Sequence, residues 1–335
     1  MIRISGIDRI ICIEKESSAL SFSNSVLLLI CLVTMLAKNA SAQTAFARFE
    51  KLWNDFDTNY AYFREKNIDW DSIRSVYAPE FQQKIPAKKE ALLLGKMILT
   101  LKDAHVSLTT SEGVYRFIKR TNTQKEEAFA PYFTTTLFNG STSQMLMNAD
   151  SIVLLRIKDL DGPIIYQDEH WQYIARSKGL IIDLSDNMGG NEKYAREFLE
   201  KLVMDTVRFK SYRFVSGKGR NLFNDWNYGT LVSANRVNYS RHIVAIINAN
   251  CSSSCEAFAL MLRSIAGCTV IGRTTAGTSG FPRQFFLDNG WSYTISTWQE
   301  ADADHNLIED RGVSPQIEIP MDKKYAEALK ILKGS

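Results

Sequence analysis

The sequence has little of what metal centres and nucleic-acid surfaces need. Its 335 residues include four histidines and five cysteines, and their dispersal gives no metal-ligand spacing. The formal net charge is only +3, with 40 basic residues scattered among 37 acids, so no basic face is indicated. We therefore expect no metal, no cofactor and no nucleic-acid partner. The remaining composition, 45% apolar and 23% charged, is ordinary for a globular protein.

The apolar run at residues 26–37 is shorter than the roughly 20 residues of a membrane span. It precedes an Ala-Ser-Ala sequence at residues 40–42, which predicts a signal peptide over residues 1–42 that is cleaved after Ala42. We expect an exported protein, periplasmic or extracellular, with no stable membrane span once the leader is removed. Glu14 and Glu16 stand where basic residues are typical, so an uncleaved anchor is the alternative.

An odd number of cysteines follows the leader, namely Cys251, Cys255 and Cys268. A bridge between Cys251 and Cys255 could form in an oxidising compartment. Small buried thiols are the commoner state for such residues, and we expect free cysteines here.

Residues 43–108 predict a small helical bundle. Apolar side chains recur every three or four residues from Phe46, Asp69 can cap a second helix, and a third helix follows Pro86. His105 stands where this third helix gives way to a strand, a position that can project into a cleft. It is a candidate general base, although a single histidine is more often structural.

From Ser151 the pattern alternates between strand and helix, which predicts an α/β fold over residues 109–335. Gly189 and Gly190 follow the buried strand at residues 179–184. Their N–H groups could bind an anion, but a tight turn would need such glycines equally. The loop lacks the lysine of a phosphate-binding P-loop.

A second buried strand, residues 243–247, ends in the polar segment 248–254 before a helix that contains Glu256. A serine is therefore expected on a tight strand-to-helix connection, where the first N–H groups of the helix lie beside its hydroxyl. This geometry suits a serine nucleophile, and it equally suits a helix N-cap. Three consecutive serines allow both roles.

Five separated blocks occur in the order found in the tail-specific, or C-terminal-processing, serine peptidases, which this sequence resembles. The blocks are residues 101–105, 183–190, 248–256, 272–277 and 309–315. One branch of that family uses a serine–lysine dyad, but Thr278 stands where its lysine would be. The tricorn-like branch, which the photoreceptor retinoid-binding protein also resembles, uses a histidine and a glutamate; both are present as His105 and Glu309.

The resemblance implies that Ser253 is the nucleophile, His105 the general base and Glu309 the carboxylate that orients it. It also implies an oxyanion hole formed by the N–H groups of Gly189 and Ser254. Where tricorn protease has a serine before the histidine, this sequence has Ala104, so one hydroxyl of the relay is missing.

The interval 109–150 is too short for the PDZ domain of the processing proteases. The resemblance therefore implies a ClpP/crotonase-like ββα superhelix, directly preceded by the helical bundle. We expect an exported serine-type peptidase that acts on peptides or unfolded proteins. The alternatives are a catalytically weak or inactive protein that binds an apolar ligand or peptide, and an esterase. The sequence leaves the oligomeric state open.

Overall fold

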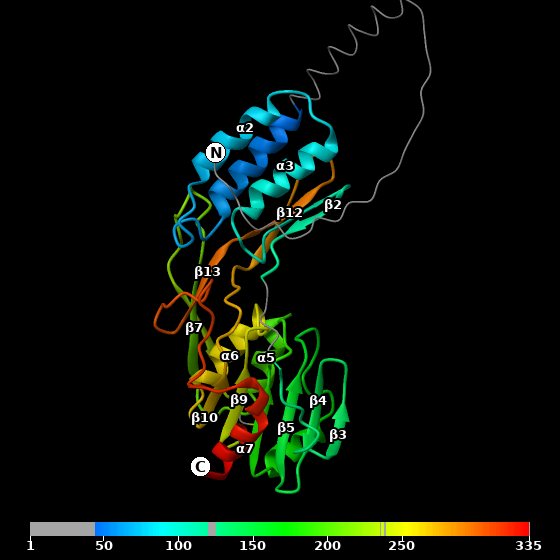
Figure 1. Cartoon of the computed structure of the whole chain (residues 1–335). Coiled ribbons are helices and arrows are strands. Elements are labelled where there is room, and N and C mark those ends of the chain that lie inside the picture. Colours follow the sequence, from blue (N-terminus) through cyan, green and yellow to red (C-terminus); the bar gives the residue numbers. More distant parts are fainter. Residues whose placement is uncertain (1–43, 120–124, 235, 238, 335) are drawn as a thin grey trace, which may run out of the picture. The chain divides into compact units, whose positions relative to one another are not determined.

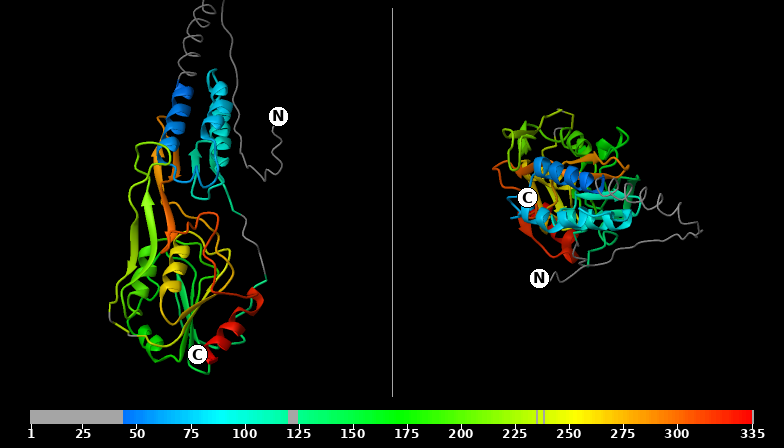
Figure 2. Two further views of the ribbon diagram at one scale, coloured as in Figure 1. Left: turned by 90° about the vertical axis from the view of Figure 1, so that its left-hand side faces the viewer. Right: turned by 90° about the horizontal axis from the view of Figure 1, so that it is seen from above.

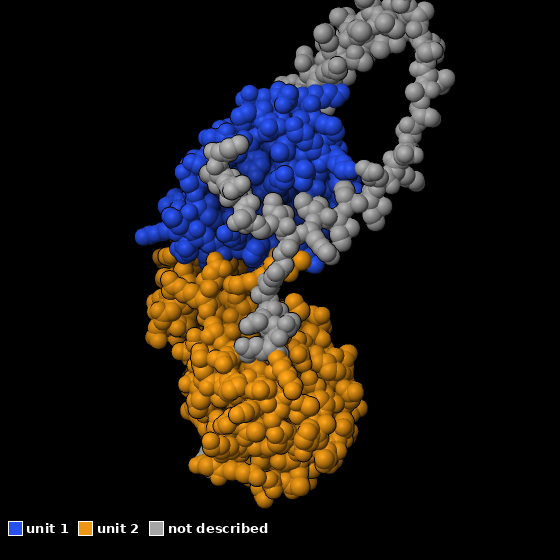
Figure 3. Space-filling model, viewed as in Figure 1, with its two compact units in different colours: residues 1–117, 216–222, 281–297 blue, residues 118–215, 223–280, 298–335 orange. Residues whose placement is uncertain are grey.

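The computed structural model describes residues 44–119, 125–234, 236–237 and 239–334 (Figure 1). The chain divides into two compact units, whose positions relative to one another are not determined (Figure 3). Unit 1 comprises residues 1–117, 216–222 and 281–297, and unit 2 comprises 118–215, 223–280 and 298–335. The predicted leader and its cleavage site lie outside the described residues. Within the described ranges, no helix is long and apolar enough to cross a membrane.

Unit 1 contains the predicted helical bundle. Its helices are residues 44–59, α2 (Trp70–Phe81) and α3 (Ala87–Leu99). Asp69 caps α2 by accepting a hydrogen bond from the Ser72 N–H at 3.0 Å, as its position predicts. The aromatic residues at helical spacing form the core, since Phe49, Phe56 and Trp70 have no exposed surface.

Unit 1 also contains a four-stranded antiparallel sheet with the order β11-β12-β1-β2. These strands are β11 (Pro282–Phe286), β12 (Ser292–Ser296), β1 (Ser107–Thr110) and β2 (Gly113–Arg116). The hairpin β11–β12 turns at Gly290, whose φ of 81° suits glycine. Pairing of β1 with β12 brings the segment after His105 beside a hairpin from much later in the chain.

Unit 2 is built on a seven-stranded mixed sheet with the order β14-β10-β9-β6-β5-β4-β3. The strands are β3 (Thr135–Asn139), β4 (Ser143–Met147), β5 (Ile152–Ile157), β6 (Gly179–Asp183), β9 (Ile243–Ile247), β10 (Cys268–Gly272) and β14 (Ile317–Glu318). Strands from β5 to β14 run parallel, while β3 and β4 are antiparallel. This confirms the predicted α/β class.

Helices cover both faces of this sheet, which explains why its central strands are apolar throughout. On one face, alternate residues such as Ile182 pack with α5 (Glu192–Leu199) and α6 (Ser254–Ser264), and α4 (His170–Arg176) adds to the same core. On the other face, their neighbours such as Ile181 pack with the 3₁₀ turn η1 (Met321–Lys323) and α7 (Lys324–Gly334) (Figure 2).

A second, three-stranded sheet in unit 2 has no counterpart in the sequence prediction. Its order is β13-β7-β8, with β13 (Trp298–Asp302), β7 (Val207–Phe214) and β8 (Asn227–Leu231). Buried charges interrupt the apolar pattern of these strands. The Lys210 ammonium lies 2.7 Å from Glu300 and 2.5 Å from Glu192. Because those charges are paired, they are tolerated inside the unit.

Candidate active site

The serine turn joins β9 to α6, since β9 ends at Ile247 and α6 begins at Ser254. Ser253 is the N-cap residue, with φ 56° and ψ −128°, a region that residues with a side chain rarely adopt. Strain of this kind persists only where the surroundings hold it, and it gathers at functional sites. Ser253 thus occupies the N-cap position that the sequence allows, in a strained backbone conformation.

A disulfide links Cys251 to Cys255 and encloses Ser253. The expectation of free thiols at these two positions is wrong. Their Cα atoms lie 5.4 Å apart because the chain turns tightly into α6, and this separation is within the range that a disulfide can bridge. Cys268 is free and buried, and burial raises the pKa of its thiol.

The serines on either side of Ser253 fasten a neighbouring loop. The Ser252 hydroxyl donates to the Met188 carbonyl at 3.0 Å, and the Ser254 hydroxyl donates to the Gly190 carbonyl at 2.6 Å. Gly189 is thereby pressed against the turn: a Cβ built on it would lie 3.0 Å from the Ser253 Cβ and 2.8 Å from the Ser252 carbonyl oxygen. With a φ of 103°, only glycine fits there without strain.

The two predicted oxyanion donors differ. The Ser254 N–H, at the start of α6, donates no hydrogen bond to any part of the chain that the structure describes. The Gly189 N–H donates to Asn187 Oδ1 at 2.8 Å. A substrate oxygen could bind Ser254 directly, whereas it would have to share or replace the Asn187 contact at Gly189.

Glu256 contacts the serine turn through several hydrogen bonds, a part that the sequence does not assign to it. Its carboxylate has no exposed surface and accepts hydrogen bonds from Thr275 Oγ1 at 2.5 Å, the Gly277 N–H at 2.7 Å and the Thr278 N–H at 2.6 Å. It also accepts from the Ser253 N–H at 3.2 Å. Burial raises its pKa to about 7, although the hydrogen bonds oppose that shift. The spacing S-x-x-E is the signal that could have identified it.

Thr278, which replaces the lysine of the dyad, lies against the serine turn. Its hydroxyl oxygen accepts from the Ser253 N–H at 3.0 Å and lies 3.0 Å from Glu256 Oε2, to which it donates. The position next to Ser253 is therefore filled by a short neutral side chain that supports the backbone of Ser253.

Glu309 is held beside this group. It is 8% exposed, and its Oε2 accepts from the Ser279 N–H at 2.7 Å, one residue after Thr278. The structure thus brings together, within unit 2, four of the five residues predicted from the sequence: Ser253, Ser254, Gly189 and Glu309.

His105 belongs to unit 1. Its N–H donates to Asp103 Oδ1 at 2.8 Å, and its carbonyl accepts from Thr294 Oγ1 at 2.7 Å, so its backbone is fixed just before β1. Its role as general base, and the effect of Ala104, remain predictions because the two units are not placed relative to one another. No group of three or more His, Cys, Asp or Glu residues in the described ranges could hold a metal ion.

Residues 154–319 match peptidase family S41, and residues 45–82 match the C1 domain of tricorn protease. The protein is a serine peptidase. It belongs to the tail-specific, or C-terminal-processing, serine peptidases that its sequence resembles, and peptides or proteins are its substrates.

Solved structures of similar fold support the same architecture. A protein from Parabacteroides merdae ATCC 43184, described as a peptidase, is 23% identical with a TM-score of 0.74, and the match covers 87% of this chain and 96% of that one. Mature CPAF in complex with lactacystin is 12% identical with a TM-score of 0.60, covering 88% and 98%. The photosystem II D1 C-terminal processing protease is 14% identical with a TM-score of 0.54, covering 87% and 98%.

Proposed function

We propose that this peptidase cleaves peptides or unfolded protein chains with Ser253 as nucleophile, His105 as general base and Glu309 as the orienting carboxylate. The observation that carries the proposal is the conformation of Ser253, a non-glycine residue at φ 56° at the start of α6. Ser252 and Ser254 donate their hydroxyls to the neighbouring loop, and neither has the positive φ of Ser253.

In this mechanism, Ser253 Oγ bonds to the substrate carbonyl carbon while its proton passes to the His105 imidazole. The Ser254 N–H stabilises the oxyanion that forms. The carbon–nitrogen bond then breaks as the imidazolium gives its proton to the leaving amine. The acyl part of the substrate is then held as an ester on Ser253. A water molecule attacks this ester in the same way and releases the carboxylic acid product.

The test of the nucleophile is Ser253→Ala, measured by hydrolysis of an unfolded protein substrate. We expect a loss of several powers of ten in kcat, with the fold retained, because removing a triad member typically costs about 10⁴-fold or more. Ser252→Ala and Ser254→Ala are matched controls that each remove one loop contact. If either control abolishes hydrolysis while Ser253→Ala does not, the assignment of Ser253 is wrong.

The test of the base is His105→Ala. We expect the rate of hydrolysis to fall as far as in Ser253→Ala. The double variant Ser253→Ala/His105→Ala should be no slower than either single variant, since the two residues act as a unit. If His105→Ala hydrolyses the substrate at the normal rate, the tricorn-like assignment is wrong and another residue acts as the base for Ser253.

The second candidate function is binding without turnover, of an apolar ligand or a peptide. Two features favour it: the relay hydroxyl is absent at Ala104, and the Gly189 N–H donates to Asn187 Oδ1. A fluorophosphonate that labels Ser253, located by mass spectrometry, would support the peptidase; a protein that binds peptide but resists the probe would support the binding function.

We also propose export. The leader at residues 1–42 predicts it, and a disulfide between Cys251 and Cys255 is typical of proteins in oxidising compartments. N-terminal sequencing of the protein recovered outside the cytoplasm should begin at Gln43. An intact leader on a membrane-associated protein would instead indicate the uncleaved anchor.

A further inference from the structure

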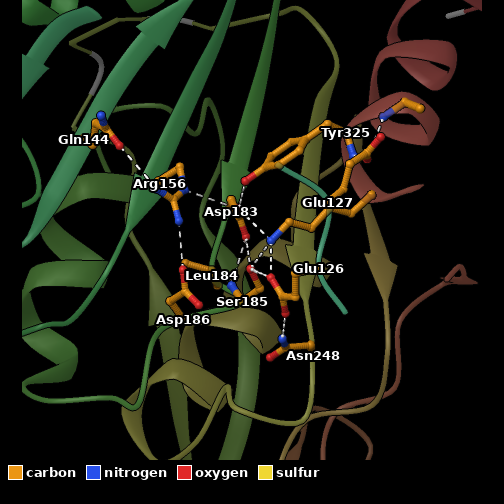
Figure 4. A network of polar contacts seen from close by, with 12 residues as sticks. Glu126, Glu127, Gln144, Arg156, Asp183, Leu184, Ser185, Asp186, Asn248 and Tyr325 are labelled. Carbon is orange, nitrogen blue, oxygen red and sulfur yellow. Dashed lines mark hydrogen bonds and ion pairs between the residues drawn. The ribbon is translucent and has the colours of Figure 1, made fainter. Parts of the chain in front are cut away.

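A second polar cluster lies at the carboxyl ends of the parallel strands in unit 2, on the face covered by α7 (Figure 4). Arg156 is near the end of β5, Asp183 ends β6, and Asn248 follows β9. Ligands of open α/β sheets commonly bind outside this edge. None of these residues belongs to the serine site described above.

A cavity of about 710 Å³ opens beside this cluster. Its lining combines three cationic side chains with acids and apolar groups, and includes Arg156, Arg273, Lys324, Glu126, Phe129 and Asn248. A volume of this size suits a small organic molecule or a short peptide segment.

At the cavity, two donors converge on one carboxylate. Glu126 accepts hydrogen bonds from Lys324 Nζ at 2.5 Å and from Asn248 Nδ2 at 2.5 Å. The Ser185 hydroxyl donates its proton to Asp183 at 2.6 Å and accepts from Lys324 Nζ at 2.6 Å, so it helps to orient the ammonium. We call Lys324 and Asn248 the carboxylate cradle. An ammonium and a neutral amide donor together give a carboxylate one charge-assisted and one ordinary hydrogen bond.

Lys324 of the cradle is buried and fixed by further contacts within unit 2. Lys324 is 1% exposed, and its ammonium lies 3.3 Å from Asp183, which also accepts from the Tyr325 hydroxyl at 2.5 Å. Burial alone would lower the pKa of Lys324, but Asp183 and Glu126 outweigh it and raise that pKa. Asp183 stays beside Lys324 when Glu126 leaves, so the ammonium keeps one carboxylate partner.

Glu126, in contrast, can leave without unfolding its segment. Its side chain is 27% exposed. The next residue holds the segment in place, since Glu127 accepts from the Tyr325 N–H at 2.6 Å and from the Tyr132 hydroxyl at 2.6 Å. A rotation of the Glu126 side chain would thus open the cradle toward the cavity.

We propose that the carboxylate cradle is a ligand site for a carboxylate, and that Glu126 fills it when no ligand is present. The ligand's carboxylate takes the two donors of the cradle, and the rest of the molecule lies in the cavity against Phe129 and the two arginines. Either the terminal carboxylate of a short peptide or a small organic acid supplies this chemistry. The site does not depend on the reaction at Ser253.

The experiment measures binding by titration calorimetry in full-length protein carrying Ser253→Ala, so that no probe is hydrolysed. The probes are N-acetyl-trialanine, its C-terminal amide and acetate. Adding Glu126→Ala should tighten binding of the free acid by about tenfold or more, because the internal competitor is removed, while the amide should not bind. Asp322→Ala, which removes an exposed acid outside the cavity, is the charge-matched control and should behave like the parent.

Asn248→Asp, combined with Glu126→Ala, should abolish binding of the free acid, because it places a negative charge in the cradle and keeps the oxygen that accepts from the Asn250 N–H. Acetate binding as tightly as the peptide acid would identify a small organic acid as the ligand, and a clear preference for the peptide acid would identify a peptide terminus. Equal binding of acid and amide, or binding that Asn248→Asp leaves unchanged, would overturn the proposal. Should Asn248→Asp fail to fold, the comparison of acid with amide in Glu126→Ala decides alone.

Discussion

Two buried carboxylates of unit 2 are stabilised in opposite ways. Glu256, beside the serine turn, accepts hydrogen bonds from hydroxyl and backbone N–H donors, and burial raises its pKa to about 7. Asp183, at the cradle, is equally buried, and burial alone would raise its pKa. The Lys324 ammonium outweighs that effect, with help from the hydroxyls of Ser185 and Tyr325, and the pKa of Asp183 is lowered.

The difference shows what a neutral donor can and cannot do in a protein interior. Several hydrogen bonds to Glu256 orient it and fasten the loop of Thr275 and Thr278, but they do not offset the cost of burying its charge. One ammonium next to Asp183 does offset that cost. The serine site is therefore arranged around a carboxyl group that can be neutral near pH 7, and the cradle around a permanent ion pair.

The largest effect is expected where the ion pair is broken. Lys324→Met removes the ammonium from the buried Asp183 and leaves only the Arg156 guanidinium, 3.8 Å away, so we expect the free energy of unfolding to fall by about 3–5 kcal/mol in denaturant titrations. The double variant Lys324→Met/Asp183→Asn should recover most of that loss, because the unpaired charge is gone. A loss below about 1 kcal/mol in the single variant would mean that the hydroxyls and Arg156 stabilise Asp183 without the ammonium, and the contrast with Glu256 would disappear.

A smaller effect should appear as a pH dependence at Glu256. Its pKa is raised from 4.5 to about 7, so the folded protein keeps a proton that the unfolded chain releases. The resulting stability is fully present below about pH 4.5 and is lost as the pH rises through about 7, amounting to about 3 kcal/mol.

This contribution is measured as the difference in free energy of unfolding between the parent and Glu256→Gln, followed across that pH range. The difference should shrink as the pH rises. Asp183, compared with Asp183→Asn, should show the reverse sign, since a lowered pKa gives stability that is lost on acidification. A flat difference for Glu256 would show that its hydrogen bonds hold it charged throughout.

Thr278→Val sharpens the comparison at the serine turn, because it removes one neutral donor from Glu256 and the acceptor of the Ser253 N–H while keeping the shape. We expect kcat for peptide hydrolysis to fall by about tenfold with little change in KM. Thr274→Val, four residues earlier on the same loop and away from Glu256, is the matched control. A change in KM alone would place Thr278 in substrate binding and not in support of the turn.

The smallest effect is expected at the exposed end of the ion-pair network. Asp186 pairs with Arg156 at 2.8 Å, but its side chain is 53% exposed. Asp186→Asn should change the free energy of unfolding by less than about 1 kcal/mol, because water already screens the pair. A loss as large as that of Lys324→Met would mean that burial does not set the strength of these pairs.

The elements that could be predicted are those whose pattern is set by burial. Strand β9 has the predicted bounds because all five of its residues are apolar and buried on both faces. Strands β7 and β13 were not predicted because Lys210 and Glu300 interrupt their apolar pattern. Those charges neutralise each other only after the two strands pair, which no local pattern reveals.

The candidate site also has features that could be predicted from the sequence and features that could not. The order of the sequence blocks was enough to place Ser253, Gly189 and Glu309 in one group. The disulfide beside Ser253 could not be predicted, because it depends on how tightly the chain turns. The part played by Glu256 was missed since its donors lie on a loop some twenty residues later.

The strand order of the large sheet has a consequence for how the molecule is made. Its strands lie side by side in the order in which they occur along the chain, so each new strand can add to an edge that already exists as synthesis proceeds. Lys324, however, follows Ser185 by 139 residues. Until the ribosome has released α7, Asp183 lacks the ammonium that lies closest to it, and only the Arg156 guanidinium, 3.8 Å away, is beside it. We expect this edge of a nascent chain to stay hydrated and open until α7 closes it.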